Sequence, residues 1–161
     1  MIRSATSADA ESVCAVYNPY VLETAVTFEE EAVSAAEMSR RIDSIVGSGL
    51  PYLAYEDAGR VLGYAYASKW RERSAYRFSV ESTVYLRGEA RGRGVGSRLY
   101  ARLLEELRGR KIHAVMGGIA LPNQASVALH EKFGFRKIAH FSEVGYKFGA
   151  YVDVGYWELI L

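Results

Sequence analysis

The residues best suited to chemistry form a short run of glycines and arginines. Residues 91–96 read Arg-Gly-Arg-Gly-Val-Gly, with three glycines in six positions. Glycine lets backbone N–H groups approach a ligand without interference from a β-carbon. The next segment, 97–108, is patterned as an amphipathic helix, whose N-terminus adds unpaired donors and partial positive charge. With two arginines beside them, these donors predict a binding site for a diphosphate group.

Two common nucleotide-binding motifs do not fit this run. A P-loop needs Lys and then Ser or Thr after its last glycine, whereas Gly96 is followed by Ser97 and Arg98. The dinucleotide-binding motif needs a glycine where this chain has Ser97. The spacing of Arg91, Gly94 and Gly96 instead resembles the coenzyme A diphosphate loop of the GNAT acetyltransferase superfamily. A solvated basic turn before a helix is the alternative interpretation.

The strand expected before this run supplies a candidate base. Residues 77–86 alternate strictly, and Glu81 shares one face with Tyr85. A carboxylate among aromatic rings has its pKa raised by desolvation, which suits a general base acting directly or through a water. The alternative role for Glu81 is a structural ion pair with Arg73 or Arg77.

A helix expected from Asn123 to about residue 133 carries His130, one turn past Ser126. A lone histidine on a helix is more often structural than catalytic, and Asn123 is equally suited to cap the helix. No cluster of His, Cys and carboxylates has metal-ligand spacing, so we expect no metal.

Composition narrows the class of protein. The 161 residues fit one domain, 1–161, and half of them are apolar. The net charge of +1 argues against nucleic-acid and membrane partners, so the basic run suits one small polyanion. The single cysteine, Cys14, cannot form an internal disulfide. The first residues lack the apolar stretch of a signal peptide, so we expect a cytoplasmic protein.

Hydrophobic periodicity and turn residues predict strands and helices around one sheet, an α/β arrangement. The expected strands are 2–5, 52–55, 61–67, 77–86, 112–119, 135–141 and 151–161, and the expected helices are 7–17, 34–46, 97–108 and 123–133. The first of these helices, introduced by Ser7 and Asp9, is expected to end near Asn18-Pro19.

Taken together, several segments resemble the phosphinothricin acetyltransferase family, and the likeness covers nearly the whole chain. The segments that carry it are 17–18, 27–29, 70–76, 80–85, 121–123, 129–131, 134–135, 144–149, 153–155 and Trp157. The resemblance implies a GNAT fold: a central mixed β-sheet, splayed at its middle to admit acetyl-CoA and flanked by helices. Relatives of this kind are typically homodimers, so we expect a homodimer.

The family also implies roles for individual residues. Glu81 and His130 match the proposed acid–base pair. The residues expected to bind acetyl-CoA are Val84, Tyr85, Leu86, Arg91, Gly92, Arg93, Gly94, Val95, Gly96, Ser97, Asn123 and Ser126. The residues expected to line the acceptor pocket are Arg73, Tyr76, Thr83 and Phe28, with the guanidinium of Arg73 binding a carboxylate or phosphinate.

The resulting hypothesis is an N-acetyltransferase that uses acetyl-CoA and a small amino acid analogue of the phosphinothricin or methionine sulfoximine/sulfone type. We expect direct transfer in a ternary complex. Acetylation of a protein N-terminus or lysine by the same fold is one alternative. A non-catalytic module that binds acyl-CoA is another.

Overall fold

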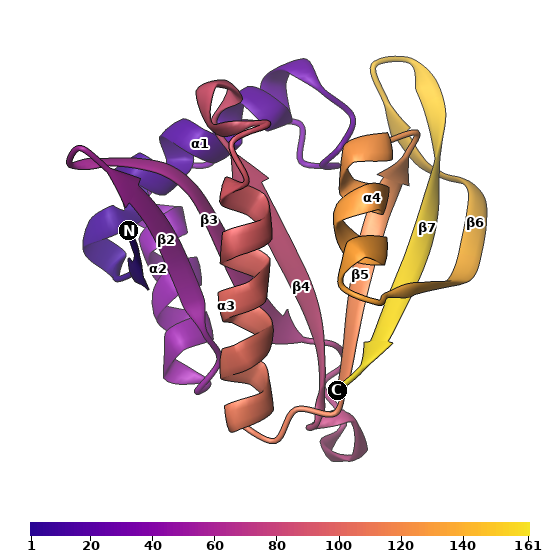
Figure 1. Cartoon of the computed structure of the whole chain (residues 1–161). Coiled ribbons are helices and arrows are strands. Elements are labelled where there is room, and N and C mark those ends of the chain that lie inside the picture. The colour runs from indigo at the N-terminus through magenta and orange to yellow at the C-terminus, as the bar shows by residue number, and fades with distance from the viewer. The chain divides into compact units, whose positions relative to one another are not determined.

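The computed structural model describes residues 1–161 and contains seven strands and four α-helices (Figure 1). Strands and helices follow one another in the order expected from the sequence. The residues divide into two compact units. Unit 1 comprises Met1–Asn18, Val33–Ser68 and Thr83–Lys111, and unit 2 comprises Pro19–Ala32, Lys69–Ser82 and Ile112–Leu161. The expectation of a single folding domain stays a prediction.

Unit 1 is built on antiparallel strands. β1 (Ile2–Ser4) pairs with β2 (Tyr52–Asp57), and β2 pairs with β3 (Arg60–Lys69). The second half of β4 (Ser79–Leu86) continues the order β1-β2-β3-β4. Tyr64 of β3 is buried and stacks against other tyrosine rings of the unit, so the strands are held by aromatic packing as well as by their hydrogen bonds.

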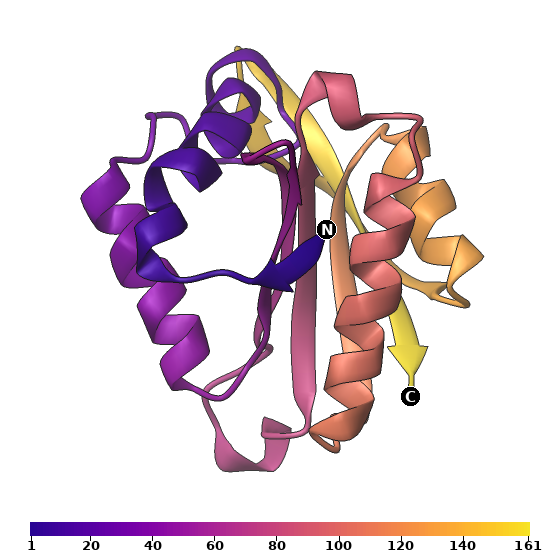
Figure 2. The same cartoon turned by 60° about the vertical axis from the view of Figure 1, so that its left-hand side comes forward.

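Helices cover both faces of these strands. The first part of α1 (Ala10–Glu23) and α2 (Ala35–Gly47) lie on one face, and α3 (Val95–Gly109) lies on the other (Figure 2). The apolar stripe expected for α3 is confirmed, because Leu99 and Leu107 are fully buried. The helix starts two residues before the expected position 97, which brings the last glycine of the run into its first turn.

The expected end of α1 at Pro19 is wrong. The helix continues through Pro19 to Glu23. Val13, Val16 and Val21 are all fully buried, at helical spacing on both sides of the proline. Burial of this apolar stripe offsets the hydrogen bond that proline cannot donate.

Unit 2 holds the first residues of β4 together with β5 (Ala114–Leu121), β7 (Ala150–Ile160) and β6 (Arg136–Lys147), in the order β4-β5-β7-β6. β4 and β5 run parallel, whereas β5–β7 and β6–β7 are antiparallel. The sheet is therefore mixed, as expected.

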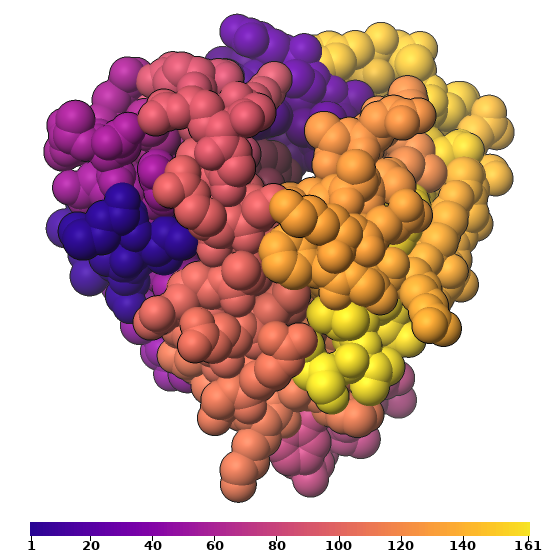
Figure 3. Space-filling view, in the orientation of Figure 1, coloured from indigo at the N-terminus to yellow at the C-terminus, as the bar shows by residue number.

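The pairing of β4 with β5 is short. It joins Ser79–Glu81 to Ala114–Met116, which is three pairs from strands of eight residues. The β4–β5 register thus ends after Glu81. α4 (Gln124–Lys132) packs on β5, and its outer side is exposed on the face seen in Figure 3.

Beyond the expected positions, β6 is longer and irregular. Its register with β7 shifts between Phe141 and Gly145, where Glu143 has a positive φ of 56°. The carboxylate of Asp153 on β7 accepts the backbone N–H of Glu143 at 2.7 Å and so fixes this bulge. No helix in the structure has both the length and the apolar character needed to cross a bilayer.

Candidate active site

The glycine–arginine run of unit 1 forms the turn between β4 and α3. Arg91 follows a 3₁₀ turn at Gly88–Ala90, and Gly94 is the N-cap of α3, which begins at Val95. Gly92 and Gly94 have φ angles of 72° and 73°, a region that favours glycine. Apart from the glycine itself and its two neighbours in the chain, no atom lies within 4 Å of the place where a β-carbon of either glycine would stand. The turn therefore presents accessible backbone at the N-terminus of a long helix.

Guanidinium groups surround the same turn. Arg93 is 3.3 Å from a carboxylate oxygen of Asp57. Arg98, one turn into α3, lies 4.9 Å over the ring of Tyr55 and donates to the carbonyl of Arg93 at 3.5 Å. A diphosphate needs N–H donors and positive charge, and the turn supplies both. These residues fit the diphosphate of coenzyme A, and Arg98 is a charge that sequence reasoning missed.

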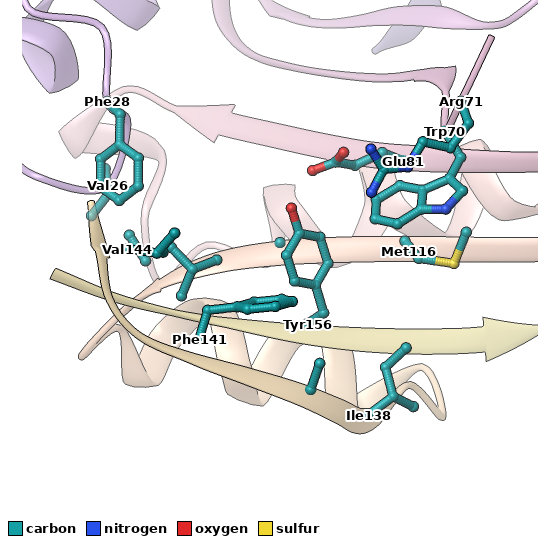
Figure 4. A pocket seen from close by; sticks show the side chains of 14 residues that line it. Val26, Phe28, Trp70, Arg71, Glu81, Met116, Ile138, Phe141, Val144 and Tyr156 are labelled. Carbon is teal, nitrogen blue, oxygen red and sulfur yellow. The ribbon is translucent and has the colours of Figure 1, made fainter.

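Unit 2 contains a cavity of about 530 Å³ with mostly apolar walls (Figure 4). The residues that line it are Val26, Phe28, Trp70, Arg71, Glu81, Met116, Gly118, Ala120, Ile138, Ala139, Phe141, Val144, Val154 and Tyr156. Among these, Glu81 and Arg71 are the charged residues. A cavity of this size and lining suits a small molecule that is apolar along most of its length.

Glu81 lies half-buried in the cavity wall. Burial raises the pKa of its carboxyl above the ordinary value, and the positive charge of Arg71 partly opposes that effect. Its carboxylate and the hydroxyl of Tyr156 both point into the cavity (Figure 4). A β-carbon at Gly118 would lie 3.1 Å from Glu81 Oε1 and from Tyr156 Cε1, so glycine leaves room for both groups. Burial, and then the charge of Glu81, raise the pKa of Tyr156.

The strict alternation expected for β4 holds around Glu81. Val80 and Ser82 are buried, whereas Glu81 lines the cavity. The hydroxyl of Ser82 donates to the carbonyl of Met116 on β5 at 3.3 Å. Met116 pairs with Glu81 in the parallel register, so the strand geometry places these two residues beside one another in the wall.

The arginine that lines the cavity is Arg71 and not Arg73. The guanidinium carbon of Arg71 lies 4.9 Å over the ring of Trp70, which also lines the cavity. Arg73 is exposed and is the N-cap of a 3₁₀ turn, Ser74–Tyr76, and the side chain of Tyr76 is 44% exposed. The structure therefore brings neither Arg73 nor Tyr76 into the cavity. Of the predicted acceptor residues, Phe28 does line it.

His130 is not part of the cavity. It is 3% exposed, and its Nδ1 lies 2.7 Å from the carbonyl oxygen of Ser126, so Nδ1–H is the donor. A β-carbon at Gly117 would lie 2.5 Å from Nε2 of His130, whereas a β-carbon at the next residue, Gly118, would meet Glu81. Successive residues of a strand face opposite sides, so β5 separates His130 from Glu81.

Burial favours the neutral form of His130. It lowers the pKa of His130, and the hydrogen bond to Ser126 only partly opposes that effect. The imidazole also packs edge-on against Phe135, with 5.0 Å between ring centroids. Asn123 caps α4, because its side-chain oxygen accepts the N–H of Ser126 at 3.2 Å. In this structure Asn123, Ser126 and His130 stabilise α4 and its contact with β5.

The remaining predicted residues, 83–86, lie in the part of β4 that belongs to unit 1. All four are partly exposed. The ring of Tyr85 packs edge-on against Tyr17, with 5.0 Å between centroids, and Leu86 lies over Gly63 of β3. These contacts fix the side chains within unit 1. All residues that line the cavity belong to unit 2, so Thr83 is not one of them.

Sequence reasoning missed Trp70, Arg71, Met116 and Tyr156 as site residues. Trp70 and Arg71 stand in the segment that carries the family resemblance, but that segment has no helical or strand period to show which arginine faces inward. Tyr156 faces the cavity because of the β5–β7 register, which pairs it with Gly118. No local pattern reveals that pairing.

Comparisons with known proteins point to one family. Residues 2–155 match the acetyltransferase (GNAT) domain family. The chain is 40% identical over 161 residues to a phosphinothricin N-acetyltransferase of Streptomyces coelicolor, which covers 98% of this chain and 94% of the relative. It is 36% identical over 161 residues to an L-methionine sulfoximine/L-methionine sulfone acetyltransferase of Pseudomonas aeruginosa, covering 99% and 94%.

Solved structures show the same likeness. A GNAT superfamily phosphinothricin acetyltransferase from Sinorhizobium meliloti, in complex with acetyl-CoA, superposes with a TM-score of 0.97 at 37% identity. The match covers 100% of this chain and 88% of that one. The predicted resemblance and fold class are confirmed. The chain therefore belongs to the GNAT acetyltransferase family and is an acetyl-CoA-dependent N-acetyltransferase.

Proposed function

We propose that this enzyme acetylates the amino group of a small amino acid analogue of the phosphinothricin or methionine sulfoximine/sulfone type. One observation carries the proposal: the cavity of unit 2 combines one carboxylate, Glu81, and one guanidinium, Arg71, with apolar walls. An amino acid presents the complementary set, an amine, a carboxylate and a side chain. The names of the relatives at 40% and 36% identity support the same substrate class.

Each part of the acceptor has a partner in the cavity. The guanidinium of Arg71 binds the α-carboxylate, because a planar guanidinium pairs with a carboxylate through two hydrogen bonds. Glu81 takes the amino group. Met116, Ile138 and Phe141 surround the side chain, since they form the apolar part of the lining. Arg71 thus replaces Arg73 in the role expected from the sequence.

Glu81 acts as the general base. The attacking amine must lose a proton. A peptide-like α-amine with a pKa of about 8 is roughly one-tenth neutral at pH 7, a lysine ε-amine near 10.4 is neutral only about once in a few thousand molecules, and a free amino acid lies between these limits. The amine nitrogen forms a bond to the thioester carbonyl carbon, the carbon–sulfur bond breaks, and coenzyme A leaves as its thiolate. Glu81 accepts the first ammonium proton directly or through a water. The nitrogen loses a second proton as the amide forms, and this proton, relayed through water, protonates the departing thiolate. The raised pKa of Glu81 makes it a better proton acceptor than an exposed glutamate.

Acetyl-CoA is held by unit 1 in this proposal. The turn at residues 91–97 and Arg98 bind the diphosphate. Backbone N–H groups of Val84, Tyr85 or Leu86 bind the pantetheine arm and the thioester oxygen, which gains negative charge during attack. Contacts of Asn123 and Ser126 with acetyl-CoA stay a prediction. His130 takes no chemical step here, because its buried position serves the packing of α4.

Direct transfer in a ternary complex needs no acyl-enzyme. Cys14, the free cysteine of the chain, is buried, and burial raises the pKa of its thiol, which disfavours the reactive thiolate. The test is initial-velocity kinetics with acetyl-CoA and L-methionine sulfone, phosphinothricin, free amino acids and a peptide amine. We expect intersecting lines and the highest kcat/KM for the first two. Parallel lines would refute direct transfer, and a preference for the peptide would refute the substrate class.

We propose a homodimer as the working form. Large apolar side chains are exposed along the β6–β7 hairpin of unit 2. They are Phe141, Val144, Tyr146, Phe148 and Tyr151, each about half exposed or more. Exposed apolar side chains concentrated on one hairpin, with the rings of Tyr146 and Tyr151 5.0 Å apart, favour association with a second copy. Sedimentation velocity should give twice the mass of 17.9 kDa, and a Tyr146→Glu, Tyr151→Glu variant should sediment as the monomer. A wild-type monomer would refute the proposal.

We also propose that the enzyme works in the cytoplasm without nucleic-acid or membrane partners. The near-neutral net charge of +1 and the free thiol of Cys14 support this proposal. Cell fractionation that recovered the protein with membranes would refute it.

A further inference from the structure

The ammonium of Lys147 is a buried charge in unit 2 that the proposed chemistry does not use. Lys147 is the last residue of β6 and is 2% exposed. A lysine is rarely buried to this extent unless polar groups satisfy its charge. The partners of this ammonium therefore indicate what the residue does.

Lys147 binds three carbonyl groups from a single stretch of chain. Its Nζ donates to the carbonyl oxygens of Val21 at 2.7 Å, Thr27 at 2.8 Å and Glu29 at 2.7 Å. An ammonium has three N–H donors, so these bonds use all of them. Val21 lies in the last turn of α1, where carbonyls lack helical partners and a cation is favourable. Lys147 thus joins the end of α1 to the connection that follows it.

That connection forms part of the cavity wall. Residues 24–34 contain no helix or strand, so side-chain contacts must fix their path. Val26 and Phe28 in this stretch line the cavity (Figure 4). Thr27 and Glu29, whose carbonyls bind Lys147, are the immediate neighbours of Phe28 in the chain. The ammonium therefore holds the backbone on both sides of this aromatic ring.

The ring of Phe28 rests on the backbone of β6 at Gly145. A β-carbon at Gly145 would lie 2.6 Å from Cε2 of Phe28 and 2.9 Å from Cε1, which is closer than such atoms approach. Gly145 and Lys147 are two residues apart in a regular part of β6, so they share one face of the strand. One face of β6 thus contacts the ring of Phe28 at Gly145 and binds the backbone on both sides of Phe28 through Lys147.

We propose that Lys147 and Gly145 are positioning residues that fix Phe28 as a wall of the acceptor cavity and so determine how well the acceptor binds. The proposal rests on the proposed function, because it takes this cavity as the acceptor site. Neither residue touches the reacting atoms, and both act through Phe28. Loss of the fixed position of Phe28 should weaken acceptor binding, but it should leave the proposed acetyl-CoA turn of unit 1 unchanged.

The first test is the kinetics of Lys147→Met with L-methionine sulfone and acetyl-CoA. The KM for the sulfone should rise about tenfold, while kcat and the KM for acetyl-CoA stay within about threefold of wild type. The matched control, Lys137→Met, removes an exposed ammonium from the same strand and should change none of these. Gly145→Ala should give the same split as Lys147→Met without removing a charge. An equal fall in kcat with no change in the sulfone KM would overturn the proposal.

A double-mutant cycle tests the route through Phe28. In a Phe28→Ala background, Lys147→Met should raise the sulfone KM by less than about twofold, and Gly145→Ala likewise, because the ring they position is gone. Effects that multiply independently would overturn the proposal. If Lys147→Met does not fold, the cycle between Gly145→Ala and Phe28→Ala decides the question alone.

Amide hydrogen exchange separates this inference from the proposed function, because it needs no acceptor. Exchange in residues 24–30 should be faster in Lys147→Met than in wild type or Lys137→Met. Unchanged exchange would overturn the role of Lys147, whatever the cavity binds. Suppose instead that exchange is faster in Lys147→Met but that the KM for the sulfone is unchanged in both Lys147→Met and Phe28→Ala. That result would overturn the assignment of the cavity as the acceptor site, and with it the proposed effect of Lys147 on acceptor binding.

Discussion

At the scale of single residues, the proposed base Glu81 should set the pH dependence of turnover. Burial raises its pKa, and Arg71 moderates the rise. A base must be ionised to accept a proton, so turnover falls as the pH drops through this raised pKa. The acidic limb of the kcat/KM profile, which reports the free enzyme, should therefore lie at a higher pH than the ordinary value of 4.5 for a glutamate.

The variant Glu81→Gln keeps the shape of the side chain and removes the base. We expect kcat to fall by about 10²–10⁴-fold, the range that general base catalysis contributes. The acidic limb assigned to Glu81 should also disappear from the profile. Calorimetric titration with acetyl-CoA is the control, and its Kd should match wild type. Turnover near the wild-type level would remove Glu81 from the mechanism.

A second prediction concerns the contribution of His130 to the stability of the folded protein. Burial holds its folded-state pKa below 6.5, so the folded protein favours the neutral ring. The stabilisation from neutral His130 is present above pH 6.5 and is lost as the pH falls toward the lowered pKa. His130→Gln should cost about 1–3 kcal/mol of unfolding free energy at pH 7.5. The gap between wild type and variant should narrow at pH 5.5.

Denaturant unfolding at pH 7.5 and pH 5.5 measures the difference in unfolding free energy between wild type and His130→Gln. Steady-state kinetics then tests whether His130 takes part in catalysis. His130→Gln should keep kcat within about threefold of wild type once the folded fraction is accounted for. A fall in kcat of about 100-fold with stability unchanged would restore His130 as an acid–base catalyst.

At the scale of elements, the start of α3 carries the turn that we propose binds acetyl-CoA. Gly94 caps this helix with a φ of 73°, where a residue with a β-carbon is strained by about 1 kcal/mol. Gly94→Ala should therefore weaken acetyl-CoA binding and lower stability, but leave the acceptor KM within about twofold. Gly47→Ala is the matched control, since Gly47 ends α2 with no positive φ and no atom near its β-carbon position. Equal acetyl-CoA affinity in wild type and Gly94→Ala would argue against this turn.

Hydrophobic periodicity in the sequence predicted those strands and helices that bury one face. Alternation in β4 placed Glu81 opposite Val80, and the leucine stripe identified α3, because periods of two and 3.6 residues follow directly from backbone geometry. The same reasoning failed at Pro19, where burial of residues on both sides outweighs the missing donor. It also failed to choose between Arg71 and Arg73, since an irregular segment has no period to count.

At the scale of the whole molecule, the candidate site depends on contacts between distant residues. Met116 reaches Glu81 through the parallel β4–β5 register, and Tyr156 reaches Gly118 through the β5–β7 register. The carbonyl groups of Thr27 and Glu29, on either side of Phe28, bind Lys147, which is more than a hundred residues away in the chain. Registers between distant strands are not encoded in any short stretch of sequence. The family resemblance supplied the fold, whereas the side of β5 on which His130 lies could be learned only from the structure.

The central claim is that the cavity of unit 2 holds an amino acid, with Arg71 on its carboxylate and Glu81 at its amine. The most direct measurement compares kcat/KM for L-methionine sulfone and for 3-(methylsulfonyl)propylamine, the same molecule without the carboxylate. Wild type should prefer the sulfone by at least about 100-fold, and Arg71→Ala should reduce that ratio to within about tenfold. The intrinsic difference between the two amines cancels when the ratios of the two enzymes are compared. Arg73→Ala should keep the wild-type ratio. An Arg71→Ala enzyme that retained the full preference would contradict the account.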